Sequence, residues 1–292
     1  MHFTRRKPEL SIIVIAYQMA RELGRTLTSL SPQYQRGVAG LDYEVIVVDN
    51  GSPVPVDMAD VTRSDRRFRL HRIDDAPSSP AHACNLGVQM SSGRNVAVVL
   101  DGARIVTPGA VARSMQALQL HRRPVVSTAA WHLGHEHQSI SIRNGYGPEV
   151  EDALLASIAW PRDGYRLFDI ASLAGSNPDG ALGTLNESCF LSLPRTLWNE
   201  VGGMDTAFDL PGGGLANLDL FTRLVGLPDS QLVILLGEGS FHQVHRGAST
   251  KPDVDTGSWY RQYEELRGQP YSRPPISPVY YGALPEPARR WL

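Results

Sequence analysis

The sequence predicts a three-layer α/β/α fold with a mostly parallel central sheet. In the first half of the chain, short apolar runs alternate with amphipathic stretches, a pattern typical of parallel strands joined by helices. Two of these runs, IIVI and VIVV, are apolar at every position, which indicates strands buried on both faces. Helices must therefore cover both sides of the sheet, and ligands are expected beyond the carboxyl ends of its strands.

The first four strands are expected at residues 11–17, 43–52, 68–73 and 95–104. Between the first two strands, Leu23, Leu27 and Leu30 recur at helical spacing, and this helix stops at Pro32. A second helix, made of small residues in PAHACNLGVQMSSG, precedes the fourth strand and ends at Gly93.

The second half of the chain is less regular. A helix is expected over about residues 108–121, followed by the strand VVSTAAWHL. The segment HEHQSISIRNGYGPE is expected to form a hairpin or a long loop, and a later helix to begin near Gly214. LVILL indicates a buried strand that leads into a loop with His242 and His245. A last helix is expected at residues 258–267, before a proline-rich tail.

Composition limits the possible partners and compartments. The chain has 292 residues, 42% of them hydrophobic and 20% charged, as is typical of a soluble globular protein. A net charge of −2 provides no general attraction for nucleic acid, so no nucleic-acid partner is expected. Two cysteines, Cys84 and Cys189, indicate neither a disulfide framework nor a zinc site. Because there is no signal peptide and no apolar run long enough for a transmembrane segment, we expect a cytoplasmic protein.

Three strand ends carry the candidate binding residues: Ala16–Tyr17, Asp49–Ser52 and Asp101–Arg104. The turn after the first strand, AYQMARELG, has no GxGxxG, and the chain has no GxxxxGK[ST], which excludes the Rossmann and P-loop phosphate cradles. In VVDNGS, Asp49 can accept hydrogen bonds from a ribose or a base, or it can simply make the turn with Asn50.

Five segments occur in the order SIIVIAYQMARELGRTLTSL, YEVIVVDNGS, PAHACNLGVQMSSG, LWNEVGGMDTAFDLPGGGLANLDLFTRL and FHQVHRG. Together they resemble family 2 glycosyltransferases, which have the GT-A fold, over roughly residues 10–247. The resemblance implies a GT-A-like nucleotide-diphospho-sugar transferase fold. It also implies transfer of a sugar from a nucleotide-diphosphate sugar to a carbohydrate or other hydroxyl acceptor, with inversion.

The resemblance implies roles for individual residues. It assigns the nucleotide sugar to Ala16, Tyr17, Arg21, Asp49, Gly51, Asn85, Asp101, Gly102 and Ala103. It also implies that Asp101 and His242 hold a divalent metal, Mn²⁺ or Mg²⁺.

The same resemblance suggests how the chain is divided. We expect residues 1–250 to form one domain, with a nucleotide-binding half at about 10–107 and an acceptor half at about 108–250. Residues 251–292 are expected to form a helix and a tail that packs on this domain or builds a homodimer contact.

The chain departs from the family pattern at the residues expected to bind the metal and the diphosphate. The family's DxD motif has its second carboxylate at the position of Ala103. Arg104 follows, and its guanidinium could clamp a phosphate bidentately and replace part of the work of an ion. Since Asp101 and one imidazole are a thin ligand set for Mn²⁺ or Mg²⁺, weak metal binding and metal-free catalysis both stay open.

An inverting transfer requires a base for the acceptor hydroxyl. The acidic pair of the family falls on Ala216–Asn217, and an amide takes no proton at neutral pH. Asp219 is the first candidate base, although an acid in a first helical turn also favours the helix dipole. Glu187 is the second candidate, and Arg104 completes the candidate catalytic residues. The alternative function is a nucleotide-sugar-binding protein that keeps the donor pocket and has lost catalysis.

A second histidine cluster lies in WHLGHEHQ, which places His132, His135 and His137 close together. The spacing is not HExxH, and a polar hairpin is favoured over a metal site. The resemblance implies that this region borders the acceptor site, where Trp131 and Trp160 either stack on sugar rings or pack in the core.

Overall fold

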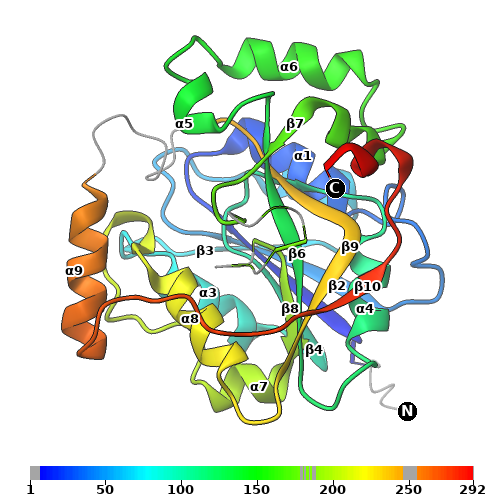
Figure 1. Ribbon diagram of the computed structural model, residues 1–292. Coiled ribbons are helices and arrows are strands. Elements are labelled where there is room, and N and C mark those ends of the chain that lie inside the picture. Colours follow the sequence, from blue (N-terminus) through cyan, green and yellow to red (C-terminus); the bar gives the residue numbers. More distant parts are fainter. Residues whose placement is uncertain are drawn as a thin grey trace, which may run out of the picture.

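The computed structural model describes residues 7–177, 180, 182–183, 185, 189–245 and 255–291. Its centre is a ten-stranded sheet in the order β10-β9-β6-β8-β4-β1-β2-β3, with β5 paired to β9 and β7 paired to β6 (Figure 1). The strands are β1 (Leu10–Ala16), β2 (Tyr43–Asp49), β3 (Arg69–Arg72), β4 (Asn95–Val99), β5 (Arg104–Val106), β6 (Pro124–Leu133), β7 (Ala171–Leu173), β8 (Leu191–Pro194), β9 (Gln231–His242) and β10 (Val279–Gly282).

Most pairs along the main path of the sheet are parallel, as the sequence predicts. Strands β3, β2, β1 and β4 are parallel neighbours, and so are β6, β9 and β10. Strand β8 is antiparallel to both β4 and β6 and joins the two parallel groups. The short strands β5 and β7 are antiparallel additions at the end of the sheet where β6 and β9 finish.

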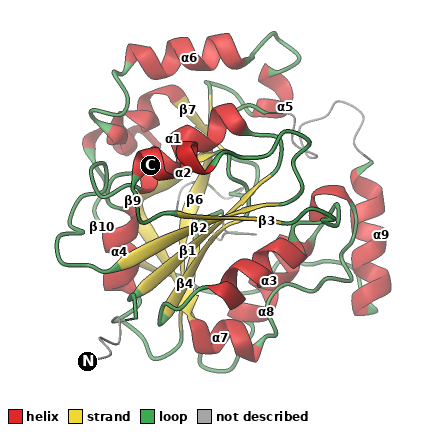
Figure 2. Cartoon of the chain, turned by 180° about the vertical axis from the view of Figure 1, so that it is seen from behind, coloured by secondary structure: helices red, strands yellow, loops and turns green. Residues whose placement is uncertain are grey.

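Helices cover both faces of the sheet. They are α1 (Ala20–Leu30), α2 (Met58–Ser64), α3 (Ala81–Met90), α4 (Ala110–Ala117), α5 (Gln138–Ser141), α6 (Pro148–Ser157), α7 (Arg195–Glu200), α8 (Ala216–Val225) and α9 (Thr256–Arg267), with 3₁₀ turns η1 (Gly164–Ile170), η2 (Pro211–Gly213) and η4 (Glu286–Trp291). Figures 1 and 2 show α3, α7, α8 and α9 together on one side of the molecule.

Alternate residues of β1 pack in two hydrophobic clusters, one on each face of the sheet. Ile13 and Ile15 pack in a cluster with α3, α7 and α8, whereas Ile12 and Val14 pack in a second cluster with α1 and α4. Because successive strand side chains point to opposite faces, an apolar strand of this kind needs a helical layer on each side. The predicted three-layer arrangement is confirmed.

Two local predictions are wrong. The segment expected as a hairpin or long loop contains α5, whose N-terminus is capped by the His137 imidazole, and it leads into α6, which begins at Pro148. The fourth strand does not continue to Arg104, because the chain bends between Val99 and Arg104 and then pairs with β9 as β5.

The C-terminal segment extends the sheet and closes one core. Strand β10 adds to β9 in parallel, and Trp291 makes an edge contact with Trp131 at 5.1 Å between ring centroids. Trp131 is 2% exposed and also packs on Phe168 and Phe241, so it belongs to the core and offers no platform for a sugar. Within the described ranges, no helix is both long and apolar enough to cross a membrane.

Candidate metal and nucleotide-sugar site

Asp101 lies in a tight bend beyond the end of β4. The Gly102 N–H donates to the Ile15 carbonyl at 2.7 Å, and the Gly102 carbonyl accepts from Thr26 Oγ1 at 2.6 Å. A Cβ on Gly102 would lie 2.8 Å from the Ile15 carbonyl oxygen, so the close approach of this bend to β1 requires glycine. The Ala103 N–H donates to Asp101 Oδ1 at 3.0 Å, which leaves Oδ2 directed elsewhere.

Three neighbouring strands place basic side chains beside this bend. Arg104 on β5 is the register partner of His242 on β9, and His242 is in turn the partner of His132 on β6. The charge of Arg104 is among the causes, after burial, that lower the pKa of His242 to about 4 and the pKa of His132 to about 2. The register of these three strands therefore places the permanent positive charge of Arg104 next to the imidazoles of His242 and His132, which are neutral at pH 7.

Asp101, His242 and His245 converge on one point at the end of the sheet. Asp101 Oδ2 lies 2.8 Å from His242 Nε2 and 3.3 Å from His245 Nε2, and the two Nε2 atoms are 3.1 Å apart. Ligand atoms at neighbouring positions around a six-coordinate divalent ion are about 3 Å apart, given bonds of about 2.1 Å. The group therefore fits three ligands on one side of such an ion.

The electrostatics of Asp101 and His242 favour a bound cation, whereas His245 has to release a proton to bind one. Although burial opposes ionisation, the two imidazoles hold the pKa of Asp101 well below its usual range. Burial lowers the pKa of His242, which keeps its nitrogen lone pair available, whereas Asp101 outweighs burial and raises the pKa of His245. One carboxylate and two imidazoles suit Mn²⁺ and other first-row ions, so the chain can hold a divalent metal without a DxD pair.

Ala103 shows why the second carboxylate of a DxD motif has no place here. Its side chain is fully buried in the core formed with β1, β4, α1 and α4. Its carbonyl accepts from the Gln243 N–H at 2.8 Å, which joins the bend to the loop between His242 and His245. The third ligand atom available to an ion therefore comes from His245, at a different point of the chain, and the position of Ala103 faces away from the group.

Asp49 holds the turn after β2. Its Oδ1 accepts from the Ser52 N–H at 2.9 Å, and its Oδ2 accepts from the Val56 N–H at 3.1 Å and from Arg72 Nη1 at 2.8 Å. The side chain is fully buried, so a base or a ribose could reach it only if the turn or Arg72 moved. Gly51 in the same turn has φ +76°, which favours glycine.

Ala16 and Tyr17 lie at the end of β1, between this turn and the Asp101 bend. The Ala16 carbonyl accepts from the Asn50 N–H at 2.8 Å, while the Tyr17 side chain is 48% exposed. The predicted nucleotide residues of the three strand ends therefore do line one edge of the sheet.

Arg21 is directed toward α6. Its guanidinium donates to Glu22 at 2.7 Å, to Asp152 at 2.6 Å and to the buried Glu151 at 3.2 Å. The prediction that Arg21 holds the nucleotide sugar is not supported by this conformation, since its donors serve the contact between α1 and α6.

Glu151 connects α6 to the histidine loop. Its Oε2 accepts from the Val244 N–H at 2.6 Å, between His242 and His245, and its Oε1 accepts from Arg21 and Arg25. The carboxylate is fully buried, and burial raises its pKa to about 7 although the Val244 N–H and the arginines act to lower it. Glu151 thus tethers the loop that carries His245.

The raised pKa of Glu151 predicts a pH-dependent stability. The folded state binds this proton more tightly than the unfolded state, so the stabilisation is complete below about pH 4 and is lost as the pH rises through about 7. Chemical denaturation of metal-free protein should show that the free energy of unfolding of wild type falls by up to about 3 kcal/mol relative to that of Glu151→Gln over this pH interval. The same pH dependence of the unfolding free energy in both proteins would refute this. Glu149→Gln, exposed on the same helix, should follow wild type.

Asn85 and Asp219 lie together in a second polar cluster. Asn85 Nδ2 donates to the Met204 carbonyl at 2.8 Å, and Asn85 Oδ1 accepts from the Met204 N–H at 2.9 Å. Asp219, with a side chain 2% exposed, accepts from Arg223 at 2.8 Å and from Arg267 at 2.6 Å, one arginine on each oxygen. The structure does not bring either residue into contact with the Asp101 group.

This cluster borders a pocket of about 580 Å³, which is lined by Asn85, Val201, Gly202, Gly203, Met204, Asp205, Thr206, Arg223 and Arg267. The Asp219 side chain is 2% exposed and each of its oxygens accepts from an arginine, so this carboxylate joins α8 to α9 and is shielded from an acceptor. The other candidate base, Glu187, lies outside the described residues.

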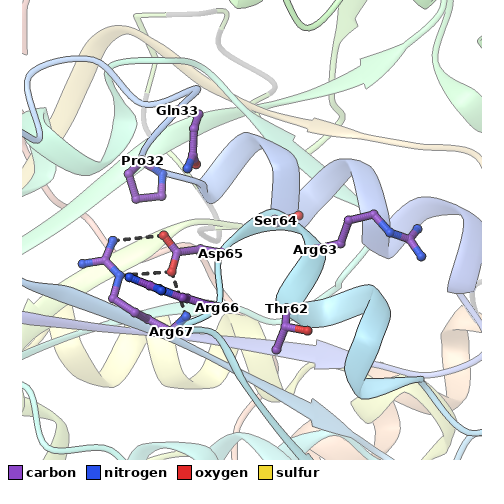
Figure 3. A pocket seen from close by; sticks show the side chains of 8 residues that line it. All are labelled: Pro32, Gln33, Thr62, Arg63, Ser64, Asp65, Arg66 and Arg67. Carbon is purple, nitrogen blue, oxygen red and sulfur yellow. Dashed lines mark hydrogen bonds and ion pairs between the residues drawn. The ribbon is translucent and has the colours of Figure 1, made fainter.

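A second pocket of about 580 Å³ lies between the end of α1 and the start of β3 (Figure 3). Its lining includes Arg63, Arg66 and Arg67, and Figure 3 shows Arg67 paired with Asp65. The pocket lies beside the amino end of β3, whereas the Asp101 group lies beyond the carboxyl ends of the strands. The two are therefore at opposite ends of the strands, and the pocket is unrelated to the candidate donor site.

Solved structures similar to this chain include GT-A-type glycosyltransferases. The chain aligns with Staphylococcus aureus TarS at a TM-score of 0.54 and 11% identity, over 88% of this chain and 42% of TarS. With TarS 1–349 in complex with UDP-GlcNAc, the TM-score is 0.55 and the identity 12%, over 88% of this chain and 65% of that one. With the mannosyltransferase PcManGT from Pyrobaculum calidifontis, in complex with GDP-Man and Mn²⁺, the TM-score is 0.54 and the identity 14%, over 92% of this chain and 67% of that one. The fold is thus of the GT-A class.

The family match refines this class. Residues 11–147 match the model of Glycosyl transferase family 2, which confirms the resemblance over the stretch that contains Asp101 and Arg104. His242 and His245 lie outside the matched residues. A search of curated proteins finds no match.

Proposed function

We propose that this chain is a metal-dependent glycosyltransferase that takes a nucleotide-diphosphate sugar and transfers the sugar to a hydroxyl acceptor with inversion. The observation that carries the proposal is the convergence of Asp101, His242 and His245 within 3.3 Å beyond β4, beside the other strand ends. The family 2 match over residues 11–147 and the GT-A fold support the same activity.

The residues of this chain would then divide the work at the leaving group. Asp101, His242 and His245 would hold the divalent ion, which would supply positive charge for the departing nucleotide diphosphate. Arg104, next to His242 in the sheet register, contributes a further positive charge toward the same oxygens. The ends of β1 and β2, at Tyr17 and Gly51, border the nucleoside.

The acceptor hydroxyl needs a base, and we propose Glu187 in preference to Asp219. Asp219 is committed to two arginines. Glu187 precedes β8 in the sequence, and Leu191, the first residue of β8, pairs with Val98 near the carboxyl end of β4, the end of the sheet where Asp101 lies. General-base removal by Glu187→Gln should lower kcat by about 10²–10⁴-fold. Asp219→Asn should instead lower stability.

The alternative is a donor-binding protein without transfer activity. The observation in its favour is that the family's acidic pair is Ala216–Asn217 in this chain. It would keep the metal group and the nucleotide edge and would lack the base.

One assay separates the two functions. Purified protein is incubated with UDP-, GDP- and dTDP-sugars, with Mn²⁺ and with EDTA, and released nucleotide diphosphate is measured with and without sugar acceptors. The glycosyltransferase proposal predicts transfer, or slow hydrolysis of at least one donor, that depends on Mn²⁺. Donor binding with neither reaction would support the alternative.

A further inference from the structure

Gln138 contacts the candidate metal ligand His242 at two points. It opens α5 and is 1% exposed. Its side-chain Nε2 donates to the His242 backbone carbonyl at 3.1 Å, and its Oε1 lies 2.6 Å from His242 Nδ1. Its backbone N–H also donates to His132 Nδ1 at 3.2 Å, which fixes the imidazole that neighbours His242 in the sheet.

These contacts determine which nitrogen of His242 carries the proton. The contact with the His242 carbonyl requires the NH₂ group of the amide, so the amide oxygen is the atom that faces Nδ1. An amide oxygen only accepts, and Nδ1 must therefore donate. A neutral imidazole carries one N–H, so with the proton on Nδ1 the Nε2 atom bears the lone pair that a metal ligand needs.

We infer that Gln138 is a positioning residue that holds His242 as the Nδ1–H tautomer and so turns the Nε2 lone pair toward Asp101 Oδ2. Two acceptor atoms 2.8 Å apart then face each other, an arrangement that a cation between them relieves. Metal-bound histidines commonly donate their second N–H to a carbonyl or carboxylate, which orients the ring and raises its basicity. The inference rests on the metal site of the proposed function.

The substitution Gln138→Met tests this directly, because it keeps the length of the side chain and removes the acceptor. Gln138→Glu restores an acceptor for Nδ1–H. Gln119→Met, at an exposed position on the segment after α4, is the matched control. Mn²⁺ affinity is measured from the EPR signal of free Mn²⁺, and the tautomer of His242 from ¹H–¹⁵N spectra of metal-free protein labelled at histidine. Thermal unfolding checks that each variant is folded.

We expect Gln138→Met to weaken Mn²⁺ binding by about 10–100-fold and to move His242 toward the Nε2–H tautomer. Gln138→Glu should keep the Nδ1–H tautomer, and Gln119→Met should keep it and also bind Mn²⁺ close to wild type. Wild-type affinity in Gln138→Met, or an Nε2–H tautomer in the wild type, would overturn the inference. A wild type that shows Nδ1–H and binds no Mn²⁺ would contradict the metal-dependent function and still support the orientation of His242 by Gln138.

Discussion

The substitution Asp101→Asn should reduce kcat/KM for donor turnover by about 10²–10³-fold, which is roughly 3–4 kcal/mol of transition-state stabilisation. The amide retains an oxygen for the Ala103 N–H, so the bend after β4 should persist. At the other position, an NH₂ group replaces Oδ2 and faces the Nε2 atoms of His242 and His245. The variant thus loses a charged ligand and places a donor where an ion would bind.

Steady-state kinetics at several Mn²⁺ concentrations test this expectation. The loss should be accompanied by weaker Mn²⁺ binding and should not be recovered at saturating donor. His135→Ala changes an exposed histidine of the same region and should leave turnover nearly unchanged. Equal losses in the two variants would show that the reaction centre has been misplaced.

Ala103→Asp recreates the family's DxD motif in sequence and should destabilise the protein without improving metal binding. The Ala103 side chain is fully buried in an apolar core that includes Met19, Leu23 and Val106. A carboxylate there would lose its water without gaining a partner, at a cost of about 3–5 kcal/mol. For a chain of this size, that corresponds to a fall in Tm of roughly 5–15 °C.

Denaturation and Mn²⁺ titration of Ala103→Asp provide the test. Ala59→Asp introduces the same charge at an exposed position in the first turn of α2 and should leave Tm almost unchanged. A stable Ala103→Asp protein with tighter Mn²⁺ binding would mean that this position faces the metal after all.

The sequence predicts the layers of the fold well because their cause is local. A strand that is apolar at every position, such as IIVI, must be buried by helices on both faces of the sheet. Asp101 follows an apolar run, which places it at the carboxyl end of a strand, where ligands of parallel sheets bind. The match over residues 11–147 confirms the family resemblance for this part of the chain.

The sequence predicts the site less completely because its contacts join distant segments. His242 and His245 lie 141 and 144 residues after Asp101, and the spacing in FHQVH is the only local sign that both could reach one point. The resemblance places Arg21 at the nucleotide, whereas in the structure Asp152 and Glu151 pair with it on α6. Gln138 lies in the segment that the sequence predicts as a hairpin or loop, and no local pattern marks Glu151, which follows that segment.

In the proposed function, Asp101, His242 and His245 hold a divalent ion against the donor diphosphate. The decisive measurement is a crystal structure with UDP and Mn²⁺, with anomalous data collected at the manganese edge. We predict one strong anomalous peak in contact with Asp101 Oδ2, with Nε2 of both histidines and with diphosphate oxygens. Bound UDP whose diphosphate lies on Arg104, with no anomalous peak at these three residues, would show that they are not metal ligands.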